Sequence, residues 1–278
     1  MRKSSKNLQT ELSIIIVNYN TGDLLASCLN SIWNSTNHFK TPNLEIILID
    51  NASSDNSVKQ AQDTNIPITL VRNSHNDGYS KSNNQGIIKA EGKYLFLLNP
   101  DTKVLKNSLQ TIIEFAKKTP NCGVVGARLL NPDGSIQNSV FHFPSVIRAV
   151  NEFWFGKKAY SGYVPTSNFP LEVDAVMGAA FLITPQASEL AGLLSEKYFM
   201  YFEDIDYCRK VNRAGLKVYY LPEAQIVHYH GISGKNLADS NNQWRRLVPS
   251  SKLYHGWFKH ELITFVIRSG TKFRKIFS

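Results

Sequence analysis

The first hundred residues alternate short, continuously apolar runs with segments of helical periodicity. Unbroken apolar runs are typical of strands buried on both faces of a parallel sheet, whereas half-exposed strands alternate apolar and polar residues. Helical patterns at 22–34 and Tyr79–Ala90 lie between them. The order predicts an α/β fold with a mostly parallel central sheet flanked by helices. The apolar runs are LSIIIV (12–17), LEIILI (44–49), ITLV (68–71) and KYLFLL (93–98).

Polar side chains follow each of these runs. Ligands of such sheets bind beyond the carboxyl ends of the strands. Each polar cluster alone would also suit a turn or a helix cap. Because parallel strands end at the same edge, we expect the clusters to form one binding site. They are Asn18 after the first run, Asp50 after the second, Asn73 after the third, and Asn99 and Asp101 after the fourth.

Three carboxylates occupy four positions at Glu203, Asp204 and Asp206, directly after an aromatic run. Like charges this close are costly to ionise together, so one pKa should rise. A carboxylate of this kind can take a proton from a hydroxyl group. The alternative is an acidic first turn of a helix, which the helix dipole stabilises. These residues alone do not decide between the two interpretations.

Size and charge limit the class of protein. A chain of 278 residues with 42% hydrophobic residues is large enough for one sizeable domain or two small ones. The net charge of +9 indicates an anionic partner, which could be a nucleotide, a phospholipid surface or a nucleic acid. The charge is not concentrated in one block and acids occupy the candidate site, so we expect no nucleic-acid partner.

Cysteine usage and the apolar runs predict a cytoplasmic protein. Cys28, Cys122 and Cys208 form no CxxC pair, which argues against a disulfide framework or a zinc site. The first apolar run is too short for the core of a signal peptide. No apolar stretch approaches the roughly 20 residues of a membrane span.

The second half of the chain is less regular. Gly178 and Ala179 are small enough to let a ligand or another backbone approach closely. The pattern predicts a helix at 105–118, a tight turn at 131–134, a long aperiodic loop at 138–170, strand character at 173–184, and two strands within 217–230 around Pro222.

Two residues could hold a metal ion. Asp101 follows a strand, and one carboxylate can hold a hard divalent cation that in turn binds a diphosphate. His228 ends the last predicted strand and could complete a metal or phosphate site, with His230 on the same face. An Asn-Pro-Asp turn and structural histidines are the alternatives. Residues 231–235 are glycine-rich and basic, and could close over a diphosphate as a lid.

The C-terminal segment, residues 246–278, combines an apolar stripe with many basic residues. A basic amphipathic helix is typical of an element that lies on a membrane surface. An ordinary packing helix with a solvated face is the alternative. We therefore expect a main domain at 1–245 and a helical, basic extension at 246–278.

Seven stretches, kept in order and spacing over residues 12–235, resemble the inverting family-two glycosyltransferases of GT-A fold, and rhamnosyltransferase-like members most of all. The resemblance implies a nucleotide-binding half at about 12–101 and an acceptor half at about 102–245. The stretches are LSIIIVNYNTGDLLASCLNSI, LEIILIDNASSDNS, NDGYSKSNNQGI, KYLFLLNPDTKV, VDAVMGAAFLIT, FMYFEDIDYCRKVNRAG and IVHYHGIS.

The resemblance also implies a role for individual residues. Asp204 corresponds to the catalytic base, and Glu203 beside it would orient the acceptor. Asn99 replaces the first acid of the family's two-aspartate motif, which removes one charge from the metal site. The other implied positions are Asn18, Asp50, Asn76, Asn99 and Asp101 for the nucleotide, Gly178 and Ala179 for the donor and acceptor pocket, and Asp101 and His228 for Mg²⁺ or Mn²⁺.

The activity implied is transfer of a sugar from a nucleotide diphosphate sugar, such as dTDP-rhamnose, to a saccharide acceptor. A lipid-linked acceptor at the inner face of the plasma membrane, used in surface polysaccharide synthesis, would suit the basic extension. One alternative is an inactive nucleotide- or membrane-binding protein of the same fold. Another is a nucleotidyltransferase, although NYNTGD after the first strand lacks the glycine-rich basic loop of that class.

Overall fold

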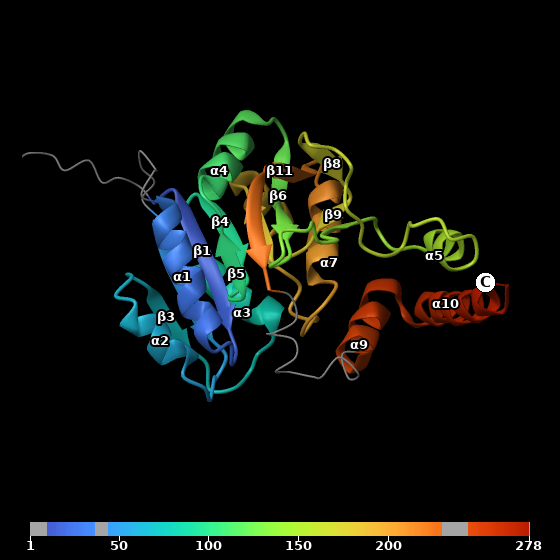
Figure 1. The fold of residues 1–278 in the computed structure, drawn as a ribbon, viewed down its shortest axis with the longest axis horizontal. Coiled ribbons are helices and arrows are strands. Elements are labelled where there is room, and N and C mark those ends of the chain that lie inside the picture. Colours follow the sequence, from blue (N-terminus) through green and yellow to red (C-terminus); the bar gives the residue numbers. More distant parts are fainter. Residues whose placement is uncertain (1–9, 37–43, 230–243, 278) are drawn as a thin grey trace, which may run out of the picture.

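The computed structural model describes residues 10–36, 44–229 and 244–277. Its central element is a nine-stranded sheet with helices on both faces (Figure 1). The strand order is β3-β2-β1-β4-β10-β6-β11-β5, and β8 pairs with β11 outside this path. The predicted α/β fold with a mostly parallel sheet is confirmed.

The first half of the sheet is parallel throughout. Its strands are β1 (Leu12–Asn18), β2 (Leu44–Asp50), β3 (Thr69–Arg72) and β4 (Tyr94–Leu98), and α1 (Asp23–Thr36), α2 (Ser57–Asp63) and α3 (Tyr79–Lys89) connect them. Alternate residues of each strand pack into two separate cores, as Ile14 and Ile15 do on opposite faces. Burial on both faces is the reason that β1, β2 and β4 are mostly apolar. β3 lies at the edge of the sheet and is exposed or half-buried, so full burial was wrongly expected for the run at 68–71.

The second half of the sheet is mixed, because β10, β5 and β8 run opposite to the other strands. The chain continues through β5 (Thr102–Val104), α4 (Ser108–Lys118) and β6 (Cys122–Leu130) to β10 (Ala180–Ile183) and β11 (Lys217–His228). β10 runs antiparallel to both β4 and β6, while β6 and β11 are parallel. Consequently the beginning of β10 and the end of β11 lie at the edge where β1, β2 and β4 end.

Residues 217–230 were predicted to form two strands, but 217–228 form the single strand β11. The register with β6 shifts between Leu221 and Gln225, so that Pro222 lies in a bulge. Proline cannot donate a ladder hydrogen bond, and a bulge removes the need for one. After the bulge, β11 pairs with β6 again. The Pro-Glu sequence at 222–223 resembles a turn, and the sequence alone does not show that the same pairing continues beyond it.

The long loop predicted at 138–170 contains regular elements, so that prediction is wrong in part. β7 (Val140–Phe141) pairs with β9 (Ala175–Val176), and α5 (Val146–Phe153) follows β7. Ser145 caps α5 by accepting a hydrogen bond from the backbone N–H of Arg148. Val146, Ala149, Val150 and Phe153 have helical spacing, which eight residues express only weakly. β8 (Leu171–Val173), α6 (Pro185–Ala191) and α7 (Glu203–Arg213) complete this half.

The C-terminal segment forms two helices, α9 (Trp244–His255) and α10 (Trp257–Phe277). Gly256 separates them with a φ of +78°, a conformation that glycine adopts without strain. α10 lies beside α5, and Ala149, Ile263 and Val266 form a small core between them (Figure 1). Within the described ranges, no helix is both long enough and apolar enough to cross a membrane.

Candidate active site

The ends of β1 and β2 form the first part of the site. Asn18 and Asp50 are register partners in the sheet, and Nδ2 of Asn18 lies 3.0 Å from Oδ1 of Asp50. Ser53 donates to the same carboxylate oxygen at 2.6 Å, and Asn18 also donates to Oγ of Ser57 at 2.9 Å. Both Asn18 and Asp50 are buried. These hydrogen bonds fix the Asp50 carboxylate at the carboxyl edge of the sheet.

An asparagine network continues this edge toward α3. Asn51 donates to Oδ1 of Asn76 at 3.2 Å and accepts a hydrogen bond from Nδ2 of Asn73 at 2.8 Å. Asn76 in turn accepts from the backbone N–H of Gly78 at 2.9 Å. Gly78 has a φ of +82°, and a Cβ there would lie 2.5 Å from the carbonyl oxygen of Phe199. The turn that enters α3 therefore contacts the segment that precedes α7.

Asp101 and His228 meet at the end of β4 and β11. Oδ1 of Asp101 lies 3.5 Å from Nε2 of His228, and both side chains are buried. Oε1 of Gln137 lies 3.1 Å from Nδ1 of His228, while Nε2 of Gln137 donates to the His228 carbonyl at 2.6 Å. Since that amide oxygen can only accept, Nδ1 donates to it, and Nε2 is the ring nitrogen that faces Asp101.

This pair fits a divalent ion. A separation of 3.5 Å suits two neighbouring ligands that are each about 2.1 Å from one cation. Across the residues that the structure describes, no group of three or more His, Cys, Asp or Glu side chains could hold a metal. An ion on Asp101 and His228 could take substrate oxygens as further ligands, as Mg²⁺ often does.

The three clustered carboxylates occupy the first turn of α7, and they separate into different environments. Asp206 pairs with Arg209 at 2.6 Å. Asp204 accepts hydrogen bonds from the backbone N–H groups of Gly178 (3.0 Å) and Ile205 (2.8 Å). Glu203 is 7% exposed, and its Oε2 is buried without a hydrogen-bond partner. The alternative of an acidic first helical turn is confirmed, since these acids do begin a helix, and the role of a base stays a prediction.

Electrostatics distinguish Glu203 and Asp204 further. Burial, reinforced by the neighbouring Asp204, raises the pKa of Glu203 well above its usual value. Burial also raises the pKa of Asp204, against the opposing effect of its backbone donors. The sequence predicted a raised pKa for one of the three carboxyl groups, and the pKa rises for two of them. The turn is strained as well, because Tyr201 and Phe202 have positive φ angles of 73° and 69°.

Tyr79 connects the two sides of the site. Its hydroxyl group donates to the carbonyl oxygen of Gly178 at 2.7 Å. Burial raises the pKa of Tyr79, and the negative charges of Glu203, Asp204 and Asp101 add to the rise. The backbone N–H of Asn99 donates to the carbonyl of Ala179 at 3.0 Å. Gly178 and Ala179 thus lie between Asp101 on one side and Asp204 on the other.

Sequence reasoning missed several of these residues. Tyr79 follows the Asn-Asp-Gly turn but was interpreted only as the start of a helix. Gln137 lies in a segment without a motif, so no local signal pointed to His228. Ser53 and Ser57 lie in the stretch LEIILIDNASSDNS, but the resemblance gave neither of them a role. His230 and the lid predicted at 231–235 lie outside the described residues.

Comparison with known proteins identifies the class. The sequence profile described as "Glycosyl transferase family 2" matches residues 13–167. The chain therefore belongs to glycosyl transferase family 2, and the protein is a glycosyltransferase. This membership disfavours the nucleotidyltransferase alternative.

Two relatives match most of the chain. One is the N-acetylglucosaminyl-diphospho-decaprenol L-rhamnosyltransferase of Mycobacterium tuberculosis, 26% identical over 240 residues, or 80% of this chain and 77% of that protein. Another is the low-salt glycan biosynthesis hexosyltransferase Agl10 of Haloferax volcanii, 24% identical over 81% of this chain and 69% of the relative. The protein is thus similar to a rhamnosyltransferase and to other hexosyltransferases.

Solved structures of glycosyltransferases share the fold. The mannosyltransferase PcManGT of Pyrobaculum calidifontis, in complex with GDP-Man and Mn²⁺, superposes with a TM-score of 0.63 at 15% identity, covering 96% of this chain and 74% of its own. GalNAc-T7 with UDP, GalNAc and Mn²⁺ gives 0.57 at 20% identity over 80% of this chain. This chain spans only 44% of the GalNAc-T7 chain. The GT-A fold expected from the resemblance is confirmed.

Proposed function

We propose that this glycosyltransferase moves a sugar from a nucleoside diphosphate sugar to a hydroxyl group of a saccharide acceptor, with inversion at the anomeric carbon. The observation that carries the proposal is the hydrogen bond between Gly178 N–H and the Asp204 carboxylate. It holds a carboxylate of raised pKa beside the sheet edge that Asp50 and Asp101 border. A base and a binding edge for the leaving nucleotide are the two parts that such a transfer needs.

In the proposed mechanism, Asp204 removes the proton of the acceptor hydroxyl as that oxygen attacks the anomeric carbon. The new bond forms on the face opposite the nucleoside diphosphate, and the bond to the diphosphate oxygen breaks with its electron pair leaving on that oxygen. One displacement inverts the configuration without a covalent intermediate. Glu203 is assigned to orienting the acceptor, and Gly178 and Ala179 form the wall between donor and acceptor.

Asn18, Asp50 and Asn76 are assigned to the nucleoside, and Asn99 and Asp101 to the diphosphate. A divalent cation, Mg²⁺ or Mn²⁺, bound by Asp101 and His228 would neutralise charge on the leaving diphosphate. Gln137 supports this assignment because it holds the imidazole in the tautomer that leaves Nε2 able to bind a metal. Asn99 contributes an oxygen without charge, so the site attracts the cation less strongly and also repels the anionic diphosphate less.

The proposed donor is dTDP-rhamnose or a similar nucleotide sugar, and the proposed acceptor is a lipid-linked saccharide for surface polysaccharide synthesis. The name of the mycobacterial relative, which includes both rhamnosyl transfer and a diphospho-decaprenol acceptor, supports both choices. We assign residues 1–245 to the transferase domain and 246–278 to a basic extension. The enzyme would then act in the cytoplasm as a peripheral protein on the inner face of the plasma membrane.

A two-stage experiment tests the proposal. Nucleotide sugars are first screened for protection of the full chain against thermal unfolding, because a ligand at about 100 times its Kd adds about 2.7 kcal/mol of stability. The stabilising donor is then incubated with lipid-linked saccharides, and the anomeric configuration of the product is determined by NMR. An inverted product supports the mechanism, whereas retention of configuration or stabilisation by no nucleotide sugar contradicts it.

A further inference from the structure

Helix α10 has two apolar sides, and among the residues that the structure describes one is buried against α5 while the other is largely exposed. Ile263 and Val266 face α5 in the small core described above. Phe258, Leu262, Phe265 and Phe273 recur along another side of the helix, and all four are exposed, Phe258 by 74% and Phe265 by 67%. A helix of a globular protein normally keeps one apolar side for the core and leaves the other polar. The second apolar side therefore requires an explanation.

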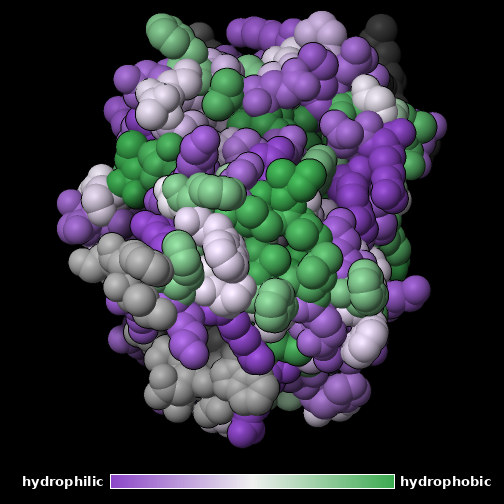
Figure 2. Space-filling view, turned by 90° about the vertical axis from the view of Figure 1, so that its right-hand side faces the viewer, coloured by the Kyte–Doolittle hydropathy of each residue, from purple (hydrophilic) through white to green (hydrophobic). Residues whose placement is uncertain are grey.

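The residues just after α5 continue this exposed apolar side of α10. The ring of Trp154, just after α5, stacks on Phe273 with centroids 5.2 Å apart, and its Nε1 donates to the Val266 carbonyl at 3.2 Å. Phe155 is exposed beside it. We call Trp154, Phe155, Phe258, Leu262, Phe265 and Phe273 the apolar face. Figure 2, which views the molecule from the side of α5 and α10, shows one broad hydrophobic area bordered by hydrophilic residues.

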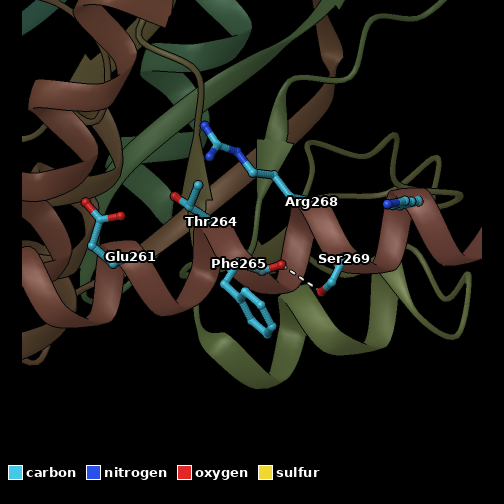
Figure 3. A pocket seen from close by; sticks show the side chains of 6 residues that line it. Glu261, Thr264, Phe265, Arg268 and Ser269 are labelled. Carbon is cyan, nitrogen blue, oxygen red and sulfur yellow. Dashed lines mark hydrogen bonds between the residues drawn. The ribbon is translucent and has the colours of Figure 1, made fainter.

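Basic residues surround the apolar face. Arg268 and Lys272 line, with Glu261, Thr264, Phe265 and Ser269, a shallow hollow of about 420 Å³ along α10 (Figure 3). Lys157 and Lys158 are exposed, and only Gly156 separates them from Phe155. Glu261 is the one acid in the sequence of α10, and it pairs with Lys252 at 3.2 Å. The border of the apolar face is therefore strongly cationic.

We propose that the apolar face is a membrane contact and that its partner is the surface of an anionic phospholipid bilayer. Exposed aromatic rings prefer the boundary between headgroups and acyl chains, and lysine and arginine at their margin attract anionic lipids. A helix of this kind lies in the interface plane instead of crossing it. A second copy of the chain fits less well, because a symmetric contact would bring two cationic borders together.

The contact includes more than the C-terminal extension, and α9 couples it to the active site. Oγ of Ser250 in α9 donates to the Met200 carbonyl at 2.8 Å. The Arg209 guanidinium of α7 lies 4.1 Å from the centre of the Tyr254 ring, which also contacts Phe202, the residue before α7. The bilayer contact and the Asp204 segment therefore belong to one packed unit. This deepens the proposed function, on whose membrane location it rests, because a lipid-linked acceptor would reach Asp204 from the membrane side.

The test measures lipid binding alone. The purified full chain is floated with phosphatidylcholine vesicles that contain or lack phosphatidylglycerol, at low and high salt. We expect flotation with the anionic vesicles, weakening as salt screens the charges, and a blue shift of tryptophan fluorescence as Trp154 enters the interface. The double variant Phe258→Ser/Phe265→Ser should bind on the order of tenfold or more weakly. Phe169→Ser, at a ring that is 76% exposed on a distant segment, is the matched control.

A charge variant tests the same surface without altering its apolar side chains. Arg268→Glu/Lys272→Glu should weaken binding to anionic vesicles by about fivefold or more for each residue changed. Lys89→Glu/Lys118→Glu, in the last turns of α3 and α4, changes the same charge elsewhere and should bind like the original chain. Equal flotation of all these variants would overturn the proposal. The proposal would also be overturned if the original chain binds no vesicles and is a dimer that Phe258→Ser/Phe265→Ser converts to a monomer. If the chain transfers sugar to a soluble acceptor but binds no vesicles, this inference is overturned and the transferase assignment stays intact.

Discussion

The backbone N–H of Gly178 donates a 3.0 Å hydrogen bond to Oδ2 of Asp204, across 26 residues of sequence. The carbonyl of the same glycine accepts a 2.7 Å hydrogen bond from Tyr79. A Cβ at position 178 would lie 3.1 Å from that hydroxyl oxygen and 3.5 Å from Cβ of Asp204. One small residue therefore allows a helix from each half of the chain to approach it, α3 at its carbonyl oxygen and α7 at its N–H.

Asp204→Asn should reduce turnover by about 10²–10⁴-fold and leave donor binding nearly unchanged, because the amide cannot accept the acceptor proton. Steady-state rates and calorimetric titration with the donor measure the two effects separately. Asp206→Asn is the control in the same helical turn, since its carboxylate pairs with Arg209. Retention of most of the turnover by Asp204→Asn would show that another group is the base.

Tyr79→Phe removes one hydrogen bond to Gly178 without removing the ring. We expect kcat to fall by about two- to tenfold, which corresponds to one neutral hydrogen bond, and the KM for the donor to stay the same. The acid limb of the kcat profile should also move, because Gly178 contacts the base. A KM that rises while kcat stays constant would instead assign Tyr79 to donor binding.

Gln137→Leu should weaken metal-dependent binding of a nucleoside diphosphate by about ten- to a hundredfold, because Nδ1 of His228 loses the partner that orients the ring. Asp101→Asn should have at least this effect, since it removes the charged ligand itself. Calorimetric titrations with Mn²⁺ and with a chelator measure the difference. Gln186→Leu, at an exposed position on α6, should bind as the original chain does. Binding that is equal with and without chelator would remove the metal from the mechanism.

The acid limb of the rate profile should lie above the usual carboxyl range. Burial raises the pKa of Asp204, and the base must be deprotonated to act, so activity should increase as the pH rises through that raised pKa. Profiles of kcat/KM against pH for the original chain measure the position of the limb. A limb centred near the ordinary aspartate value would contradict the environment described for Asp204.

Glu203→Gln should make the protein more stable at neutral pH. Because burial raises the pKa of Glu203 above 4.5, its contribution to stability is complete below that ordinary value and is lost as the pH rises through the raised pKa. The advantage of the variant should therefore grow above pH 4.5 by on the order of 1 kcal/mol per pH unit until the raised pKa is passed. Denaturant unfolding across this window measures it, with Glu189→Gln at an exposed position as control.

Much of the first half of the fold could be predicted because its signals are local. Four apolar runs define strands, of which β1, β2 and β4 are mostly buried, and α1 and α4 have clear apolar spacing. α3 has no apolar stripe, since its buried residues are small or polar. α2 lacks such a stripe, since SVKQAQD buries only Ser57, Val58 and Ala61. The second half was harder, because β10 reverses direction and β11 continues through Pro222, and both depend on which strand lies alongside.

For the candidate site, the sequence by itself determined the edge and the residue types. A polar residue at the end of an apolar run stays at the strand end whichever strand lies alongside. The positions of Asn18, Asp50, Asn99 and Asp101 could therefore be predicted from the apolar runs. Only the tertiary structure decided which distant groups meet there. Tyr79, Gly178 and Asp204 come together, as do Gln137 and His228, because strands far apart in sequence become neighbours in the sheet. Hydrogen bonds and desolvation act over a few ångströms of space, and the order of residues along a chain does not contain those distances.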